Sequence, residues 1–486
     1  MDSIAKNYTY NVIYQIVSVI IPFITVPYVS RVLGAEGIGV NAYTGSIVQY
    51  FALFGSLGIG LYAGRSVAYK RDDKEQLSKT FWSIFILQAA LCSIAFILYL
   101  LFVLLFIEKY KLIQIIQSLS LLSIAVDISW LFVGIEDFKK LILRSIFFRI
   151  LGVVSIFMFI NAPSDLWKYI VISTVSIFLG QIVMWAYLKN IVNKVTVKFE
   201  DVVIHLKPSL QLFIPQIAIQ VYLVVNRTML GVMSSTQEVG LYENADKIIK
   251  ISLATITAIG GVMLPRISNS FARGDTEKIN YYLYTIFNFV SYLAIPFMFG
   301  LIGVSAQFVP WFLGSEFAKC SILLIILSPI IIAIAWSNVM GMQYMIPTGR
   351  TNQFTISVVV GAVINLVLNL ILIRNFHSIG TAIATVLAEI AVTATQMYYL
   401  RDTLKFSTLY PNMVKYLFSS LIMFIPVMLI GHFFGAIPKT SVFQVITGAV
   451  TYILVLFLLK SDINNFIFSR VFGKIYRKLS NRKTVA

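Results

Sequence analysis

Hydrophobic residues occur in long runs, separated by short polar turns, along nearly the whole chain of 486 residues. A run needs roughly 20 residues to cross a hydrocarbon core of about 30 Å, so the pattern predicts fourteen membrane-spanning helices. The fold class is therefore predicted to be an all-α polytopic membrane protein. The predicted spans cover residues 10–30, 38–63, 80–107, 112–135, 141–161, 167–188, 209–231, 239–265, 280–305, 320–345, 354–374, 378–400, 413–436 and 440–460.

Two stretches about 200 residues apart share one spacing of glycines and arginine. From Gly39 the first stretch reaches Gly60 after 21 residues and Arg65 after 26. The second repeats both intervals, with its members at Gly240, Gly261 and Arg266. The copies fall on the second and eighth spans, so they share one orientation, as in transporters built from parallel repeats. We expect two six-helix lobes, residues 1–200 and 201–402, followed by two helices and a basic tail in residues 403–486.

The composition excludes a compact soluble protein. Hydrophobic residues make up 58% and charged residues 12% of the chain, against roughly 25% charged in soluble domains. The net charge of +17 does not indicate nucleic-acid binding, because it is concentrated in alternate loops. The N-terminus, every second loop and the tail hold 27 Lys and Arg residues, and the opposite loops hold 7. This bias predicts that both termini are cytoplasmic and that the basic tail rests on membrane lipids.

The sequence shows no arrangement for covalent chemistry. It lacks the phosphate-binding loop of ATPases, and its two cysteines and three histidines are scattered. No paired carboxylates or Cys/His dyad stands out. We therefore predict transport, with no catalytic residue, no metal site and no cofactor.

Charged residues at bilayer depth are the main site candidates, since each costs at least about 2.5–3.5 kcal/mol unless it is paired or hydrated. The eighth span carries four on one helical face, with pairs possible at i and i+4: Glu243 with Lys247, and Asp246 with Lys250. They are either ion pairs that lock the helix or the wall of a hydrated cavity, and we favour the cavity. The other substrate-binding candidates are Arg31, Arg149, Arg227 and Arg266, of which Arg31 and Arg266 are equally suited to anchoring at the interface.

Four polar residues of the eleventh and twelfth spans are spaced one helical turn apart in pairs. They are Asn365, Asn369, Glu389 and Thr393. Their oxygens could hold a small cation such as Na⁺. Hydrogen bonding between helices explains the same residues, and we favour that interpretation.

Four strings of the sequence are similar to those of a known family: the residues from Pro27 to Gly39, from Asn226 to Gly231, from Glu238 to Tyr242 and from Leu264 to Ser268. On these strings the sequence resembles, over the whole chain, the bacterial polysaccharide repeat-unit flippases, the O-antigen and capsule transporters of the multidrug/oligosaccharidyl-lipid/polysaccharide exporter (MOP) superfamily. The family often has Asp where Asn226 stands, which weakens the case for a cation site around the seventh span.

The resemblance implies two lobes around a central cavity, with the last two helices forming a groove for a lipid tail. It implies a flippase that moves an undecaprenyl-diphosphate-linked oligosaccharide repeat unit across the bacterial cytoplasmic membrane by alternating access, for surface polysaccharide export. Arginine suits such a cargo, because its planar donors bind phosphate in two directions. Coupling to Na⁺ or H⁺ and contact with polysaccharide polymerase machinery are left open. The alternatives are a peptidoglycan-precursor or teichoic-acid flippase, a cation-coupled drug antiporter of the same superfamily, and a membrane scaffold that transports nothing.

Overall fold

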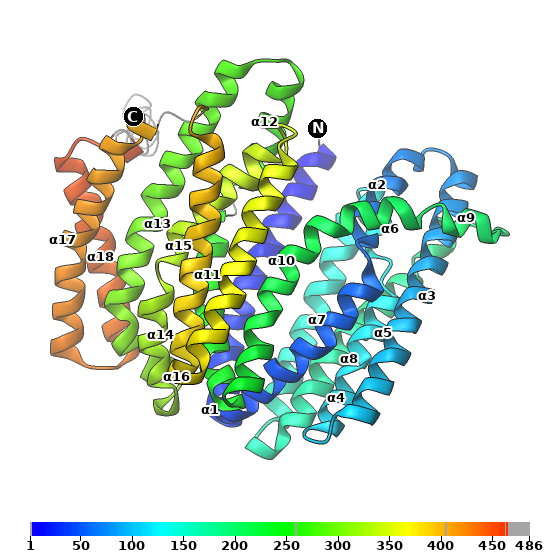
Figure 1. Cartoon of the computed structure of the whole chain (residues 1–486), viewed down its shortest axis with the longest axis horizontal. Helices are drawn as coiled ribbons and strands as arrows, with labels where there is room; N and C mark the ends of the chain where they lie inside the picture. Colours follow the sequence, from blue (N-terminus) through cyan, green and yellow to red (C-terminus); the bar gives the residue numbers. More distant parts are fainter. Residues whose placement is uncertain (1, 258–259, 404–405, 462, 465–486) are drawn as a thin grey trace, which may run out of the picture. The chain divides into compact units, whose positions relative to one another are not determined.

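The computed structural model describes residues 2–257, 260–403, 406–461 and 463–464, and these residues are almost entirely helical (Figure 1). The helices of five residues or more are α1 (Asp2–Ser56), α2 (Ile59–Lys70), α3 (Lys74–Phe106), α4 (Lys111–Gln117), α5 (Leu119–Ala125), α6 (Ser129–Gly134), α7 (Phe138–Phe159), α8 (Leu166–Trp185), α9 (Phe199–Val203), α10 (Leu206–Met233), α11 (Thr236–Thr257), α12 (Gly260–Ala272), α13 (Thr276–Phe312), α14 (Lys319–Leu327), α15 (Ile330–Ser337), the π-helix Asn338–Met345, α16 (Thr351–Leu400), α17 (Tyr410–Phe434) and α18 (Pro438–Leu458).

Ten helical segments among the described residues are long and apolar enough to cross a membrane. Two of these, 58 and 50 residues long, each contain two of the predicted spans. The first changes direction at Gly34 (φ 67°), inside α1, and the second at His377 (φ 51°), inside α16. The seventh and eighth predicted spans lie on α10 and on α11 with α12, which are not among the ten.

Several predicted spans are interrupted where the sequence predicted continuous helices. The second breaks at Leu57 and Gly58, both with positive φ, before α2 begins. A Cβ at Gly58 would lie 3.1 Å from the backbone nitrogen of Phe213 on α10, so glycine fits both the dihedral angle and the space. The fourth span is split into α4, α5 and α6, and the tenth ends in the π-helix.

The helices form two compact units. Unit 1 comprises residues 1–243 and 369–378, and unit 2 comprises residues 244–368 and 379–486. These units are defined by contacts and not by the sequence repeat, so the lobe boundaries at residues 200 and 402 stay a prediction.

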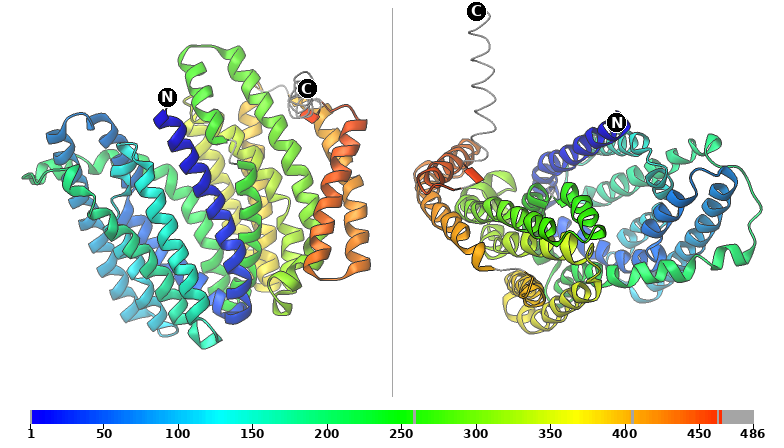
Figure 2. Two further views of the ribbon diagram at one scale, coloured as in Figure 1. Left: turned by 180° about the vertical axis from the view of Figure 1, so that it is seen from behind. Right: turned by 90° about the horizontal axis from the view of Figure 1, so that it is seen from above.

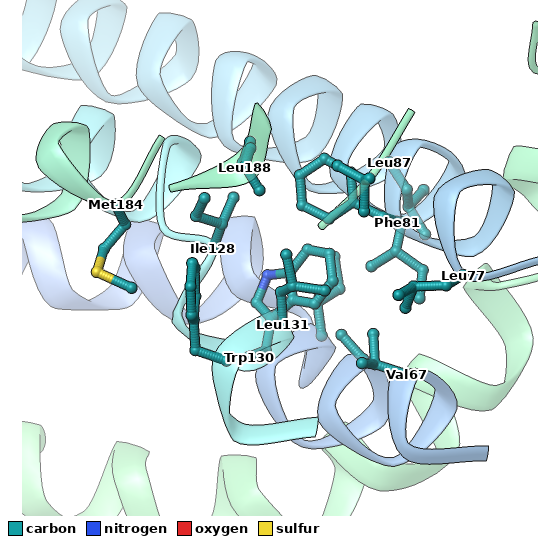
Figure 3. Packing of buried hydrophobic residues seen from close by; sticks show 14 of the residues in the cluster. Val67, Leu77, Phe81, Leu87, Ile128, Trp130, Leu131, Met184 and Leu188 are labelled. Carbon is teal, nitrogen blue, oxygen red and sulfur yellow. The ribbon is translucent and has the colours of Figure 1, made fainter. Parts of the chain in front are cut away.

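Unit 1 has an aromatic core between α2, α3, α6 and α8 (Figure 3). Phe81 and Leu131 are fully buried in it, beside Trp130. The indole nitrogen of Trp130 donates to Gln88 Oε1 at 2.9 Å, and Gln88 donates in turn to the carbonyl of Asp127 at 2.8 Å. This bond satisfies the polar edge of a buried indole and fixes the broken fourth span against α3.

Unit 2 packs α13 against α17 and α18, which lie side by side in orange and red (Figure 2). Three tyrosines fill the space between them. Tyr416 and Tyr452 both contact the ring of Tyr292, and the Tyr452 hydroxyl donates to the Tyr292 carbonyl at 2.8 Å. The last two helices are therefore an integral part of unit 2.

Candidate functional site

The repeated glycines found in the sequence meet each other in unit 1. Ala35 and Gly39 of α1 cross Thr236 and Gly240 of α11, and we call these four residues the glycine crossing. A Cβ at Gly39 would lie 2.9 Å from Gly240 N, and one at Gly240 would lie 2.9 Å from Gly39 N. The Cβ at Gly39 would also overlap the carbonyl oxygen of Thr236, and the Cβ at Gly240 would overlap that of Ala35. The two backbones are therefore in direct contact, which only small residues allow.

Two adjacent polar links join α10 to α11. Arg227 Nε lies 2.6 Å from Glu243 Oε2, with the side chains 25% and 8% exposed. One residue earlier, Asn226 Nδ2 donates to the Tyr242 hydroxyl at 3.0 Å. Arg227 is thus a partner of Glu243, which the spacing along α11 did not predict. The predicted Glu243–Lys247 pair stays a prediction.

The second predicted pair on α11 is confirmed. Lys250 Nζ lies 2.6 Å from Asp246 Oδ2, with the Lys250 side chain 44% exposed and that of Asp246 17% exposed. Lys247 between them is partly buried. The charged face of α11 therefore contributes to two ion pairs. Asp246 and Lys250 form one in unit 2, and Glu243 forms the other with Arg227 in unit 1.

Two of the four candidate cation ligands bond to other protein groups. Asn369 Nδ2 donates to Asn226 Oδ1 at 2.8 Å within unit 1. In unit 2, the Thr393 hydroxyl lies 2.9 Å from the carbonyl oxygens of Ala333 and Glu389. Asn365 and Glu389 are buried in the same unit. The hydrogen bonds of Asn369 and Thr393 are of the kind that we favoured over a cation site. Among the described residues, no group of three or more His, Cys, Asp or Glu suited to a metal occurs.

A cavity of about 460 Å³, with arginine, serine and apolar side chains in its wall, lies between α1, α7 and α8 of unit 1. Arg144 and Arg149 are five residues apart on α7, so their side chains leave the helix about 140° apart. Arg149 reaches α1, where it donates to Ser18 and Tyr14 at 2.9 Å each. Arg144 reaches α8, where it donates to the Gly180 carbonyl at 3.1 Å and to Gln181 Oε1.

We call this space the arginine cavity. Its described lining includes both guanidinium groups, three serines (Ser145, Ser173 and Ser176) and no Asp or Glu. Arg144 Nε is buried there without a hydrogen-bond partner. The cavity therefore suits a ligand that is anionic and rich in acceptors, such as a phosphate. Sequence analysis predicted Arg149 and missed Arg144, for which the available signal was a second arginine inside the fifth predicted span.

The remaining predicted residues lie elsewhere. Arg31 is exposed on α1, three residues before the change of direction at Gly34, and Arg266 is exposed on α12. Neither lines the arginine cavity. Both side chains are exposed, and the choice between substrate binding and anchoring at the interface stays open for them.

An apolar groove of about 380 Å³ lies between α13, α17 and α18 of unit 2. Gly300 and Gly448 leave room along its walls, and Val445 and Ile453 line it as exposed apolar side chains. Gln444 in the groove donates to the Val427 carbonyl at 2.9 Å, which hides its amide donor. The groove therefore presents hydrocarbon to whatever occupies it.

Residues 4–271 match the protein family described as "Polysaccharide biosynthesis protein". The chain belongs to this family. A protein of Escherichia coli (strain K12) named "Putative O-antigen transporter" is 26% identical over 404 residues, which cover 82% of this chain and 97% of the relative. The resemblance that the sequence predicted is confirmed by this match.

Solved structures share the fold. The lipid II flippase MurJ in an inward closed conformation aligns with a TM-score of 0.75 at 18% identity, over 94% of this chain and 99% of that one. An inward-facing multidrug resistance MATE family transporter of the MOP superfamily aligns with a TM-score of 0.59 at 14% identity, over 81% and 99% of the two chains. This chain is therefore an all-α multi-pass membrane protein that shares the fold of these two structures, as predicted.

Proposed function

We propose that this protein is a flippase that moves an undecaprenyl-diphosphate-linked oligosaccharide repeat unit across the cytoplasmic membrane for surface polysaccharide export. The relatives are named as transporters and flippases, which supports transport over enzymatic catalysis. The observation that carries the proposal is the arginine cavity. It places two permanently charged guanidinium groups around about 460 Å³ of space that no carboxylate lines among the described residues.

The cavity fits the diphosphate of such a cargo. Each arginine donates hydrogen bonds to neutral hydroxyls or carbonyls, which are weaker acceptors than phosphate oxygens. An entering diphosphate replaces these bonds with charge-assisted ones, worth about 1.5–3 kcal/mol each. Serine hydroxyls on α7 and α8 then supply further donors to the same oxygens.

The apolar groove of unit 2 fits the other end of the cargo. A polyprenyl chain has no hydrogen-bonding groups, and the groove between α13, α17 and α18 presents almost only hydrocarbon. The tail therefore stays in an apolar environment while the headgroup moves. The glycine crossing is a direct contact between α1 and α11, which belong to different predicted lobes, and alternating access requires contacts between the lobes to change.

The charge of the arginine cavity disfavours a drug–cation antiporter. Such a carrier binds cations and needs carboxylates in its cavity, whereas two arginines repel a cation there. Coupling to Na⁺ or H⁺ stays open, as does contact with polymerase machinery.

The test replaces each arginine with glutamine in the full-length protein. In proteoliposomes that contain a fluorescent undecaprenyl-diphosphate disaccharide, Arg149→Gln and Arg144→Gln should each reduce flipping about tenfold to a hundredfold, since about 1.4 kcal/mol corresponds to a factor of ten. Surface polysaccharide should fall in cells that lack the native gene and carry the variant.

Arg65→Gln is the matched control. Arg65 of α2 also donates to a tyrosine hydroxyl, that of Tyr69 at 3.0 Å, but lies outside the cavity. It should flip the lipid at the normal rate. Normal flipping by both cavity variants, at normal protein levels, would contradict the proposed role of the arginines.

A further inference from the structure

Unit 1 contains a second cavity, of about 510 Å³, with a more polar wall than the first. It lies where three connections meet: the change of direction at Gly34 of α1, residues 107–110 between α3 and α4, and residues 234–235 between α10 and α11. We call it the tyrosine cavity, after Tyr43 and Tyr110 in its wall. The distribution of Lys and Arg predicts that these connections face the outside.

Its electrostatics are opposite to those of the arginine cavity. Two carboxylates, Glu36 and Glu108, line it together with one ammonium group, Lys109. This lining repels a phosphate, yet offers acceptors for hydroxyl donors, and carboxylates accept such bonds strongly. Hydroxyl groups of Ser234 and Thr236 add positions that both donate and accept.

A buried amide in the wall carries an unused donor. The Gln114 side chain is fully buried, and its Oε1 accepts from the Tyr99 hydroxyl at 2.6 Å. This bond fixes the amide, and Gln114 Nε2 is left without a hydrogen-bond partner. A buried donor in this state destabilises the folded protein. A ligand oxygen at this wall removes that cost.

The ring of Tyr110 is held in place by a strained backbone. Tyr110 has φ 63°, a left-handed conformation that is strained for a residue other than glycine. Its hydroxyl lies 3.5 Å from Thr236 Oγ1, and Lys109 Nζ lies 4.7 Å from the ring centre. The strain places an aromatic surface in the cavity, and such a surface packs against the apolar C–H face of a sugar ring.

We propose that the tyrosine cavity binds the sugar portion of the cargo, as a neutral, hydroxyl-rich oligosaccharide, at the outer end of unit 1. The inference rests on the proposed function for the origin of that sugar. Unit 1 then carries separate cavities for the two chemical ends of one headgroup, an arginine-lined one for the diphosphate and a carboxylate-lined one for the glycan. A glycan held here is withdrawn from the diphosphate path, which favours release outward.

The test measures sugar binding directly. The full-length protein in lipid nanodiscs is mixed with maltose and with N,N′-diacetylchitobiose, and saturation transfer from protein to sugar is recorded by NMR. Inorganic pyrophosphate serves as the anionic probe. At least one disaccharide should receive saturation, and excess pyrophosphate should not displace it.

Two variants locate the site. Tyr110→Gly removes the ring and at the same time relieves the positive φ, so thermal stability should hold or rise while sugar saturation falls at least fivefold. Gln114→Leu should cause a similar fall, because it removes the buried donor. Tyr110→Phe keeps the ring and should bind within twofold of the original protein.

The outcomes separate this inference from the proposed function. Full sugar binding by Tyr110→Gly, displacement by pyrophosphate, or no saturation of either sugar would overturn the tyrosine cavity, whatever the flipping assay gives. Lost sugar binding in Tyr110→Gly, combined with normal flipping by the arginine variants, would keep the cavity and refute the role of the arginines.

Discussion

Replacing Gly39 with alanine should force α1 and α11 apart. The new Cβ would lie 2.5 Å from the Thr236 carbonyl carbon, whereas ordinary contacts begin at 3.4 Å, so the helices must separate by at least about 0.9 Å there. For Gly240→Ala the Cβ would lie 2.9 Å from the Ala35 carbonyl carbon, which requires at least about 0.5 Å. Overpacking of this kind costs about 1–3 kcal/mol.

The two substitutions should not be additive. Both are relieved by the same separation of α1 from α11, so the double variant should cost about as much as Gly39→Ala alone. The coupling energy in a double-mutant cycle is then about 1–3 kcal/mol, in the range seen for residues in direct contact. The midpoint of thermal unfolding of the purified protein, in one detergent at one lipid content, gives the four values of the cycle.

Gly60 provides the control for this cycle. It belongs to the same sequence repeat, but a Cβ there meets nothing within 4 Å. Gly60→Ala should be neutral or stabilising by about 0.5–1 kcal/mol, because alanine favours the helix. Additive losses for Gly39→Ala and Gly240→Ala, or an equal loss for Gly60→Ala, would show that the crossing is not a direct backbone contact.

Two further substitutions test local features of unit 1. Asn226→Leu should cost about 1–3 kcal/mol, because it leaves the buried amide of Asn369 without the acceptor that now lies 2.8 Å away, and the unfolding midpoint measures this. His205 precedes α10, and its Nδ1 lies 2.7 Å from the Tyr62 hydroxyl. Burial lowers the pKa of His205 below 6.5; the charge of Lys70 lowers it further, and that of Asp201 raises it. Since the folded state disfavours the proton, stability should be constant above about pH 7 and fall as the pH drops below about 6.5, and His205→Gln should remove that fall.

The sequence predicted the all-α membrane fold because hydrophobic length is a local property, and the count of fourteen crossings stays a prediction beside the ten apolar segments found among the described residues. It also located the glycine crossing indirectly, since Gly39 and Gly240 are members of the repeat. It did not predict the break at Leu57 and Gly58 or the π-helix at Asn338–Met345, because the residues on both sides are apolar. The close approach of Phe213 to Gly58 is a tertiary contact that no pattern in the second span records.

The cavities were predicted only in part, because each is lined from helices far apart in the chain. Arg149 was identified from its depth in the bilayer, but its partners Ser18 and Tyr14 come from α1, and the cavity's third wall comes from α8. The tyrosine cavity joins Glu36 to Thr236, which are about 200 residues apart. Helical spacing reports which residues share a face, and it does not report which other helix that face meets.

The charged face of α11 shows how this limit changes a functional argument. Spacing along one helix pairs Glu243 with Lys247, a link worth only about 0.3–0.5 kcal/mol that would leave the face free to line a cavity. In the structure Glu243 lies 2.6 Å from Arg227, so it joins α10 to α11 beside the Asn226–Tyr242 bond. Removing one partner of such a buried pair leaves an uncompensated charge, and Arg227 is therefore held more firmly than a substrate ligand needs to be. The arginines of α7 bond only to neutral groups among the described contacts, and they are the better site for an anionic headgroup.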